Sequence, residues 1–182
     1  MSQAELLSLV ISIFAELGIE HMLVGSHASS FWGEARSTHD VDLVVKIDHD
    51  AIPKLVSKFD HHRYYLSEIA FREGRMANII DTFSGDKVDC FILGNNPYDQ
   101  LAFSRRLSKT IIDVNVDIAS AEDTILSKLR WSKMVDGSLQ QLADAREIIR
   151  VQGDALDVPY LEREGETLGL SEVLRELLDE QL

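Results

Sequence analysis

Two aspartates one residue apart, Asp40 and Asp42, open an apolar run that continues to Val45. Alternate residues of a β-strand point to the same face, about 6.5–7 Å apart, so two such carboxylates can bind the same divalent cations. Carboxylate oxygens are the ligands that Mg²⁺ prefers, and bound cations of this kind promote phosphoryl and nucleotidyl transfer. The spacing therefore indicates a metal-dependent transfer site, although a pair of solvated acids at a strand entrance has the same sequence.

A third aspartate, Asp89, lies inside another apolar run, between Val88 and Cys90. Burying an unpaired carboxylate costs several kcal/mol, so we expect Asp89 to face a site, a metal ion or solvent. In a transfer site it completes the metal-binding set or accepts the proton of the attacking hydroxyl.

Gly25 and Ser26 follow the apolar stretch 21–24 and stand where a helix over 26–32 is predicted to begin. Backbone N–H groups at a helix start bind phosphate, and glycine lets the ligand approach the backbone closely. The Ser26 hydroxyl adds a donor. We therefore expect a phosphate-binding turn at these two residues. Arg36 either meets the same phosphates or pairs with a nearby carboxylate.

Periodicity and turn residues predict the elements that position this chemistry. Helices are expected at 4–17, 26–32, 50–59 and 97–103, and strands at 21–24, 41–47, 76–83, 87–93 and 110–118. The strands 76–83 and 87–93 form an antiparallel hairpin across Ser84-Gly85-Asp86. Further helices are expected after an N-cap at Ser120, at 138–151, and from Pro159 to the end.

These elements predict an α+β protein. Residues 1–119 are expected to form a core of strands and helices, and residues 120–182 a helical region packed on it. The 182 residues, 45% of them hydrophobic, suffice for such a core. No apolar run approaches the roughly 20 residues of a membrane span, no signal peptide is visible, and Cys90 is the single cysteine. We therefore expect a cytoplasmic protein without a membrane partner.

The formal net charge of −13 argues against broad nucleic-acid binding, because proteins that bind nucleic acid carry basic patches on their surface. It suits a protein that binds metal ions or a basic partner. Arg105-Arg106 form a basic pair in mid-chain, which either reaches phosphate or acceptor or lies in a solvated turn.

The order of these features resembles the nucleotidyltransferase superfamily of the DNA polymerase β type: a strand, Gly-Ser, a helix, Asp-x-Asp on a strand, and a later Asp on another strand. "GEARSTHDVDLVV" (33–45) is similar to the signature of its small prokaryotic branch, which includes the AbiEii-type toxins. The similarity extends over residues 18–165. It includes "DIASAEDTILSKLRW" and "LADAREIIRV", where a helix with a lysine precedes a helix with an aspartate.

The resemblance implies roles for single residues. Gly25 and Ser26 match the phosphate-holding pair, where the family often has Gly-Gly, and Asp40, Asp42 and Asp89 match the metal-binding carboxylates. Lys128 matches a lysine that touches nucleotide phosphate, and Asp144 matches the aspartate that orients it. The implied fold has a mixed or antiparallel sheet flanked by helices. The implied cofactor is Mg²⁺ or Mn²⁺, the donor is a nucleoside triphosphate (NTP), and the acceptor is a hydroxyl group.

The sequence does not determine whether the acceptor is a small molecule, a tRNA or a protein. A toxin-like enzyme would modify tRNA, whereas the acidic surface fits a cationic metabolite or antibiotic better. The same sequence features also fit a protein of another class: a catalytically inactive binding module, or an antitoxin-like partner that kept the fold.

His39 beside Asp40 suggests a His-Asp phosphohydrolase. In those enzymes the His and Asp residues lie on helices, whereas a strand is expected here. "DTFSG" at Asp81 lacks the glycine of the aspartic-protease motif.

Overall fold

The computed structural model describes residues 2–36, 38, 40–111, 113–135 and 137–180. His39 and Ile112, which entered the sequence interpretation, lie outside these residues. The chain divides into two compact units: unit 1 comprises Met1–His27 and Ser37–Ile118, and unit 2 comprises Ala28–Arg36 and Ala119–Leu182. The division passes through helix α2 (Gly25–Trp32).

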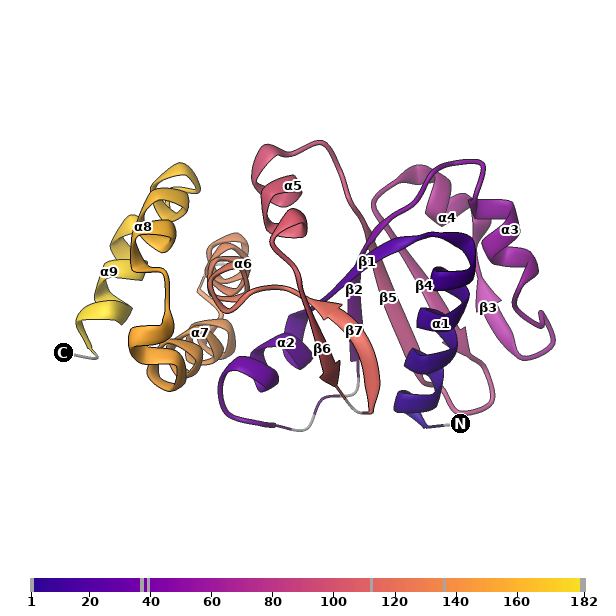
Figure 1. Cartoon of the computed structure of the whole chain (residues 1–182), viewed down its shortest axis with the longest axis horizontal. Coiled ribbons are helices and arrows are strands. Elements are labelled where there is room, and N and C mark those ends of the chain that lie inside the picture. Colours follow the sequence, from indigo (N-terminus) through magenta and orange to yellow (C-terminus); the bar gives the residue numbers. More distant parts are fainter. Residues whose placement is uncertain (1, 37, 39, 112, 136, 181–182) are drawn as a thin grey trace. The chain divides into compact units, whose positions relative to one another are not determined.

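Unit 1 contains a mixed sheet, confirming the predicted fold class. Seven strands within the described residues are joined in the order β3-β4-β5-β2-β1-β7-β6 (Figure 1). Their bounds are β1 Glu20–Val24, β2 Asp40–Lys46, β3 Tyr64–Leu66, β4 Met76–Asp81, β5 Lys87–Ile92, β6 Leu107–Ile111 and β7 Val114–Ile118. The central strand β2 runs parallel to β5 and antiparallel to β1.

The helices of unit 1 are α1 Gln3–Leu17, α3 Ile52–Ser57, α4 Glu68–Glu73 and α5 Pro97–Ser104. A capping box between Ser2 and Glu5 begins α1. Gly18 ends the helix in the left-handed region at φ 67°, which confirms the predicted stop. The apolar stripe of α1 is buried, and the helix packs against β1, β5 and β7.

Unit 2 contains the helices α6 Ala121–Met134, α7 Leu139–Gln152, α8 Val158–Thr167 and α9 Ser171–Asp179, and the 3₁₀ turn η1 Gly153–Ala155. The predicted N-cap is confirmed: the Ser120 hydroxyl accepts a hydrogen bond from the Asp123 backbone N–H at 3.0 Å. Among the described residues, no helix has the length and apolar character needed to cross a membrane.

The prediction of one strand over 110–118 was wrong. The segment contributes to two antiparallel strands, β6 and β7, in which Ile111 pairs with Val114. Asp113 makes the tight connection at φ 60°, a conformation that aspartate tolerates better than most residues. The apolar alternation belongs to β7, and alternation alone does not reveal a turn made without Gly or Pro.

Other element boundaries also differ from the prediction. The helix expected over 50–59 is limited to Ile52–Ser57, and the helical stretch from Pro159 is divided into α8 and α9 at Gly169, whose φ is 67°. The short elements β3 and α4 were not predicted, because three to six residues carry too little periodicity to reveal them.

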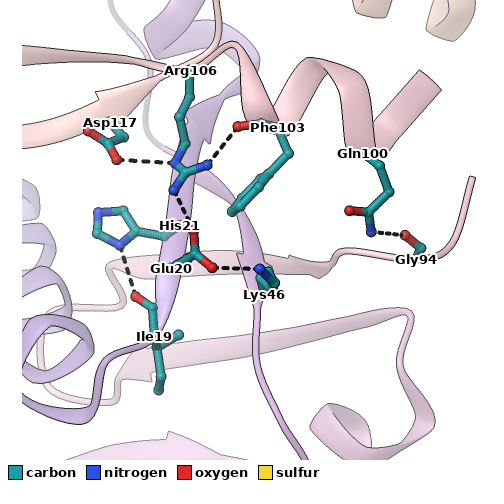
Figure 2. Close-up of polar contacts among 9 residues, drawn as sticks. All are labelled: Ile19, Glu20, His21, Lys46, Gly94, Gln100, Phe103, Arg106 and Asp117. Atoms are coloured by element: carbon teal, nitrogen blue, oxygen red, sulfur yellow. Dashed lines mark hydrogen bonds and ion pairs between the residues drawn. The ribbon is translucent and has the colours of Figure 1, made fainter. Parts of the chain in front are cut away.

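Arg106 joins three elements of unit 1. Figure 2 shows its guanidinium donating to Asp117 on β7 at 3.1 Å, to Glu20 on β1 at 2.6 Å and to the carbonyl of Phe103 on α5 at 2.8 Å. The guanidinium also lies 4.3 Å from the Phe103 ring centroid. Arg106 therefore holds structural contacts, rather than lying in the solvated turn considered for it.

We expect Arg106→Gln to lower the free energy of unfolding by about 1–2 kcal/mol, because it removes charge-assisted hydrogen bonds to two elements. Urea denaturation measures the loss. Lys46→Gln is the matched control, since Lys46 donates to the same Glu20 carboxylate from an exposed position, and an exposed pair contributes less than about 0.5 kcal/mol. Equal losses in the two variants would contradict a special role for Arg106.

Candidate active site

The register of β1, β2 and β5 gathers the predicted carboxylates and glycine at one end of the sheet. Asp42 of β2 lies opposite Asp89 of β5, and Asp40 lies opposite Lys87. The antiparallel strand β1 ends at the same place, where Val24 pairs with Asp42. Val41, Leu43 and Val45 are fully buried, and strand alternation therefore places Asp40 and Asp42 on the opposite face from these core side chains.

Gly25 is required by its close approach to Asp42. A Cβ atom at Gly25 would lie 2.1 Å from Asp42 Oδ2, far inside van der Waals contact, and the residue has a φ of +65°. Only glycine satisfies both conditions without strain. Ser26 follows in the first turn of α2. The structure therefore places the Gly-Ser pair beside one of the predicted metal-binding carboxylates.

Asp89 is held by two side chains that the sequence interpretation missed. Lys87 Nζ donates to Asp89 Oδ2 at 2.8 Å, and the Asn78 side-chain amide donates to Asp89 Oδ1. Lys87 Nζ also lies 3.5 Å from Asp40 Oδ1. The carboxylate of Asp89 raises the pKa of Lys87, which therefore carries a full positive charge at neutral pH.

Lys87 carries a signal that the sequence shows, because it lies two residues before Asp89 and therefore on the same strand face. Asn78 carries no such signal. It reaches Asp89 because β4 pairs with β5 in the register Asn78↔Asp89, which the hairpin prediction did not specify.

The carboxylates provide hard oxygen donors suited to Mg²⁺ or Mn²⁺, and the Lys87 ammonium shows that Asp40 and Asp89 converge on one cation. Within the described residues, however, no group of three or more His, Cys, Asp or Glu side chains lies close enough to hold a metal ion. The set Asp40, Asp42 and Asp89 as joint metal ligands therefore stays a prediction.

His27, in the first turn of α2, is a buried polar residue beside the Gly-Ser pair. It is 7% exposed, and its Nε2 atom finds no hydrogen-bond partner within the described part of the chain. Burial lowers its pKa below the ordinary value. The His27 imidazole is therefore neutral in the folded protein at neutral pH.

Unit 2 contains the remaining predicted residues in one network. Lys128 and Asp144 are both buried, and Lys128 Nζ donates to Asp144 Oδ2 at 2.7 Å. Arg36 Nη2 donates to the same oxygen at 3.1 Å, and Gln140 donates to Asp144 Oδ1 at 2.8 Å. Arg36 therefore pairs with a carboxylate, which was one of its two expected roles, and a contact with phosphate stays a prediction.

The contact joins Asp144 to Lys128, and the role of Asp144 in orienting that lysine at phosphate stays a prediction. Burial alone would raise the pKa of Asp144, but the hydrogen bonds from Lys128 and Gln140 outweigh it and keep the pKa below its ordinary value. One ionised carboxylate thus holds both the Lys128 ammonium and the half-exposed Arg36 guanidinium.

Asp81, the residue of "DTFSG", has a structural explanation. Arg63 donates to its carboxylate at 2.8 Å, and the Phe83 backbone N–H donates to it at 3.0 Å. The hydrogen bond from Arg63 is the main cause that lowers the pKa of Asp81 to about 2. The residue fixes the turn after β4.

A scan against protein-family models gives no match, and neither does a search of curated proteins. Solved structures do share the fold. The antibiotic-resistance factor ANT(2")-Ia, in complex with adenylyl-2"-tobramycin, has a TM-score of 0.60 at 12% identity over 93% of this chain and 98% of that chain.

Two further structures are similar. A nucleotidyltransferase-like protein from Paracoccidioides brasiliensis has a TM-score of 0.55 at 17% identity over 95% of this chain and 92% of its own. The lincosamide antibiotic adenylyltransferase LnuA, bound to lincomycin, has a TM-score of 0.53 at 13% identity over 78% of this chain and 93% of its own. The chain therefore has a nucleotidyltransferase fold, and its resemblance to the AbiEii-type branch stays a prediction.

We expect Gly25→Ala to destabilise the protein by at least about 1 kcal/mol more than Gly18→Ala, because only the former forces a methyl group into Asp42. Gly18 is the matched control, since its φ is +67° and no atom lies within 4 Å of the added Cβ. The backbone strain of about 1–2 kcal/mol is then common to both variants. Urea denaturation measures the free energy of unfolding of both variants. Equal losses of stability would contradict the prediction, because they would show that Asp42 moves away from the added methyl group without cost.

The lowered pKa of His27 predicts an acid-sensitive contribution to stability. A group whose folded pKa lies below its unfolded value stabilises the protein above the unfolded pKa, near 6.5, and the contribution is lost as pH falls below it. We expect His27→Gln to lose less stability than the unchanged protein between about pH 7.5 and about pH 5. Urea denaturation at the two pH values measures this, and the exposed His61→Gln serves as control.

Proposed function

We propose that this protein transfers a nucleoside monophosphate from an NTP to a hydroxyl group, with Mg²⁺ or Mn²⁺ as cofactor. One observation carries the proposal: the register of three adjacent strands brings Gly25, Asp42 and Asp89 together at one end of the sheet. A phosphate-binding turn beside paired carboxylates is the arrangement that nucleotidyl transfer needs. The nucleotidyltransferase fold supports this reading.

Each residue of unit 1 has a role in this proposal. Gly25 and Ser26 bind the triphosphate through backbone N–H groups and the hydroxyl. Asp40 and Asp42 would hold the divalent ion, which when bound neutralises phosphate charge and favours departure of pyrophosphate. Asp89, the third carboxylate of the predicted set, would accept the proton of the acceptor hydroxyl. The roles of Lys128 and Asp144 at phosphate rest on the resemblance alone.

The reaction is an in-line displacement. The acceptor oxygen forms a bond to the α-phosphorus as the bond to the bridging oxygen breaks, and the hydroxyl proton passes to Asp89. Pyrophosphate leaves with the electron pair of the broken bond. Asn78 and Lys87 hold the two oxygens of Asp89, so the orientation of this carboxylate is set before substrate binds.

For the acceptor, we propose a small cationic molecule ahead of tRNA or a protein. The net charge of −13 attracts cations and opposes the phosphate backbone of tRNA. Two structures with this fold, those of ANT(2")-Ia and LnuA, are described with adenylyl-tobramycin and lincomycin. The charge also suits a basic protein partner, which is the alternative for an antitoxin-like role.

One observation favours the rival function, a catalytically inactive binding module. The Lys87 ammonium already neutralises Asp89 and approaches Asp40, where an active site would offer these carboxylates to a metal ion. Calorimetry with Mg²⁺ and each NTP separates the two readings, because an inactive module shows no metal-dependent NTP binding.

We expect Asp42→Asn to abolish nucleotide transfer while leaving the fold intact, since the amide keeps the shape of the side chain and loses the charge that binds metal. The assay combines labelled NTPs, Mg²⁺ and cell extract, so that the labelled fraction also identifies the acceptor class. Circular dichroism checks the fold.

The exposed Asp50→Asn is the matched control for Asp42→Asn, because it removes the same charge away from the candidate site. Its transfer rate should equal that of the unchanged protein. Undiminished transfer by Asp42→Asn would overturn the proposed function.

A further inference from the structure

Two like charges lie opposite each other in the parallel pair of β2 and β5. Asp42 pairs in register with Asp89, and like charges at opposite positions of adjacent strands destabilise a sheet. Asp89 is also only 5% exposed, so water does little to screen it. A positive charge beside Asp89 would therefore reduce this repulsion before any ligand binds.

Lys87 supplies that cation from the same strand. Its ammonium lies 2.8 Å from Asp89 Oδ2 and 3.5 Å from Asp40 Oδ1, on the face that the carboxylates share. Asn78 engages the other oxygen of Asp89, so both oxygens already have donors. A divalent ion bound to Asp89 would have to displace the ammonium from its 2.8 Å contact.

We propose that Lys87 takes the place of one divalent cation in the carboxylate cluster, so that the site binds a single divalent ion through Asp40 and Asp42 while Asp89 stays paired with Lys87. This inference rests on the proposed function, which assigns Asp40 and Asp42 to metal binding. It changes the role of Asp89 from a metal ligand to a carboxylate positioned by Lys87 and Asn78.

The contacts of the two outer carboxylates support this division. The Asp89 side chain is 8% exposed and makes the shorter contact with Lys87, whereas the Asp40 side chain is 54% exposed and makes the longer one. Asp40 can therefore turn toward an ion shared with Asp42, two residues along the same strand. Asp89 lacks this freedom.

The test counts Mn²⁺ ions bound to the full chain without nucleotide, by electron paramagnetic resonance and by calorimetry. We expect one Mn²⁺ ion per chain in the unchanged protein. Lys87→Gln should bind a second ion, or bind Mn²⁺ at least about tenfold more tightly, because it frees Asp89 from its fixed positive charge. Lys46→Gln, which removes a lysine from the other end of β2, should bind as the unchanged protein does.

Asp89→Asn provides a second test that does not depend on the folding of Lys87→Gln. If Asp89 is not a metal ligand, the affinity for Mn²⁺ should stay within about twofold, whereas losing a carboxylate ligand would weaken it about tenfold or more. Two ions in the unchanged protein, no Mn²⁺ binding at all, no gain in Lys87→Gln, or a tenfold loss in Asp89→Asn would each overturn the inference.

The two proposals fail separately. A protein that binds one Mn²⁺ ion, gains affinity in Lys87→Gln and transfers no nucleotide refutes the proposed function and leaves the role of Lys87 intact. A protein that transfers nucleotide and binds two ions in its unchanged form refutes the role of Lys87 alone.

Discussion

The parallel pairing of β2 with β5 is the constraint on which the candidate site depends. It sets Asp42 opposite Asp89 and Asp40 opposite Lys87, while the antiparallel pairing of β1 with β2 brings Val24, and with it Gly25, to the same end of the sheet. A shift of one residue in the β2–β5 register would turn the acids toward the core and the apolar residues toward the site. The fully buried Val41, Leu43 and Val45 oppose that shift.

Charge compensation is the second principle of the structure, and each unit satisfies it within itself. In unit 1, Lys87 offsets the repulsion between carboxylates that the register brings together. In unit 2, the relation is reversed, because the single carboxylate Asp144 holds the cations Lys128 and Arg36.

Arg106 illustrates why a charged motif is a weak guide to function. Beside Arg105 it forms a tight basic pair in the sequence, which suggested phosphate or solvent. In the fold it joins α5, β1 and β7 through Phe103, Glu20 and Asp117. An arginine with several donors in a planar fork is suited to such a junction, and its partners come from sequence positions too distant to be recognised by spacing.

The sequence by itself determined the residue chemistry and most of the local structure. The Asp-x-Asp spacing, the apolar runs and the glycine stops predicted β2, the hairpin of β4 and β5 and the end of α1, because these depend on neighbouring residues. The mixed sheet was implied by the family resemblance. The turn at Asp113 escaped prediction, since its conformation is rare for residues other than glycine. Only the tertiary structure decided that Gly25 touches Asp42, that Lys87 and Asn78 hold Asp89, and that Asp144 pairs with both Lys128 and Arg36. Those contacts depend on strand register and helix packing across distant parts of the chain, which local periodicity does not encode.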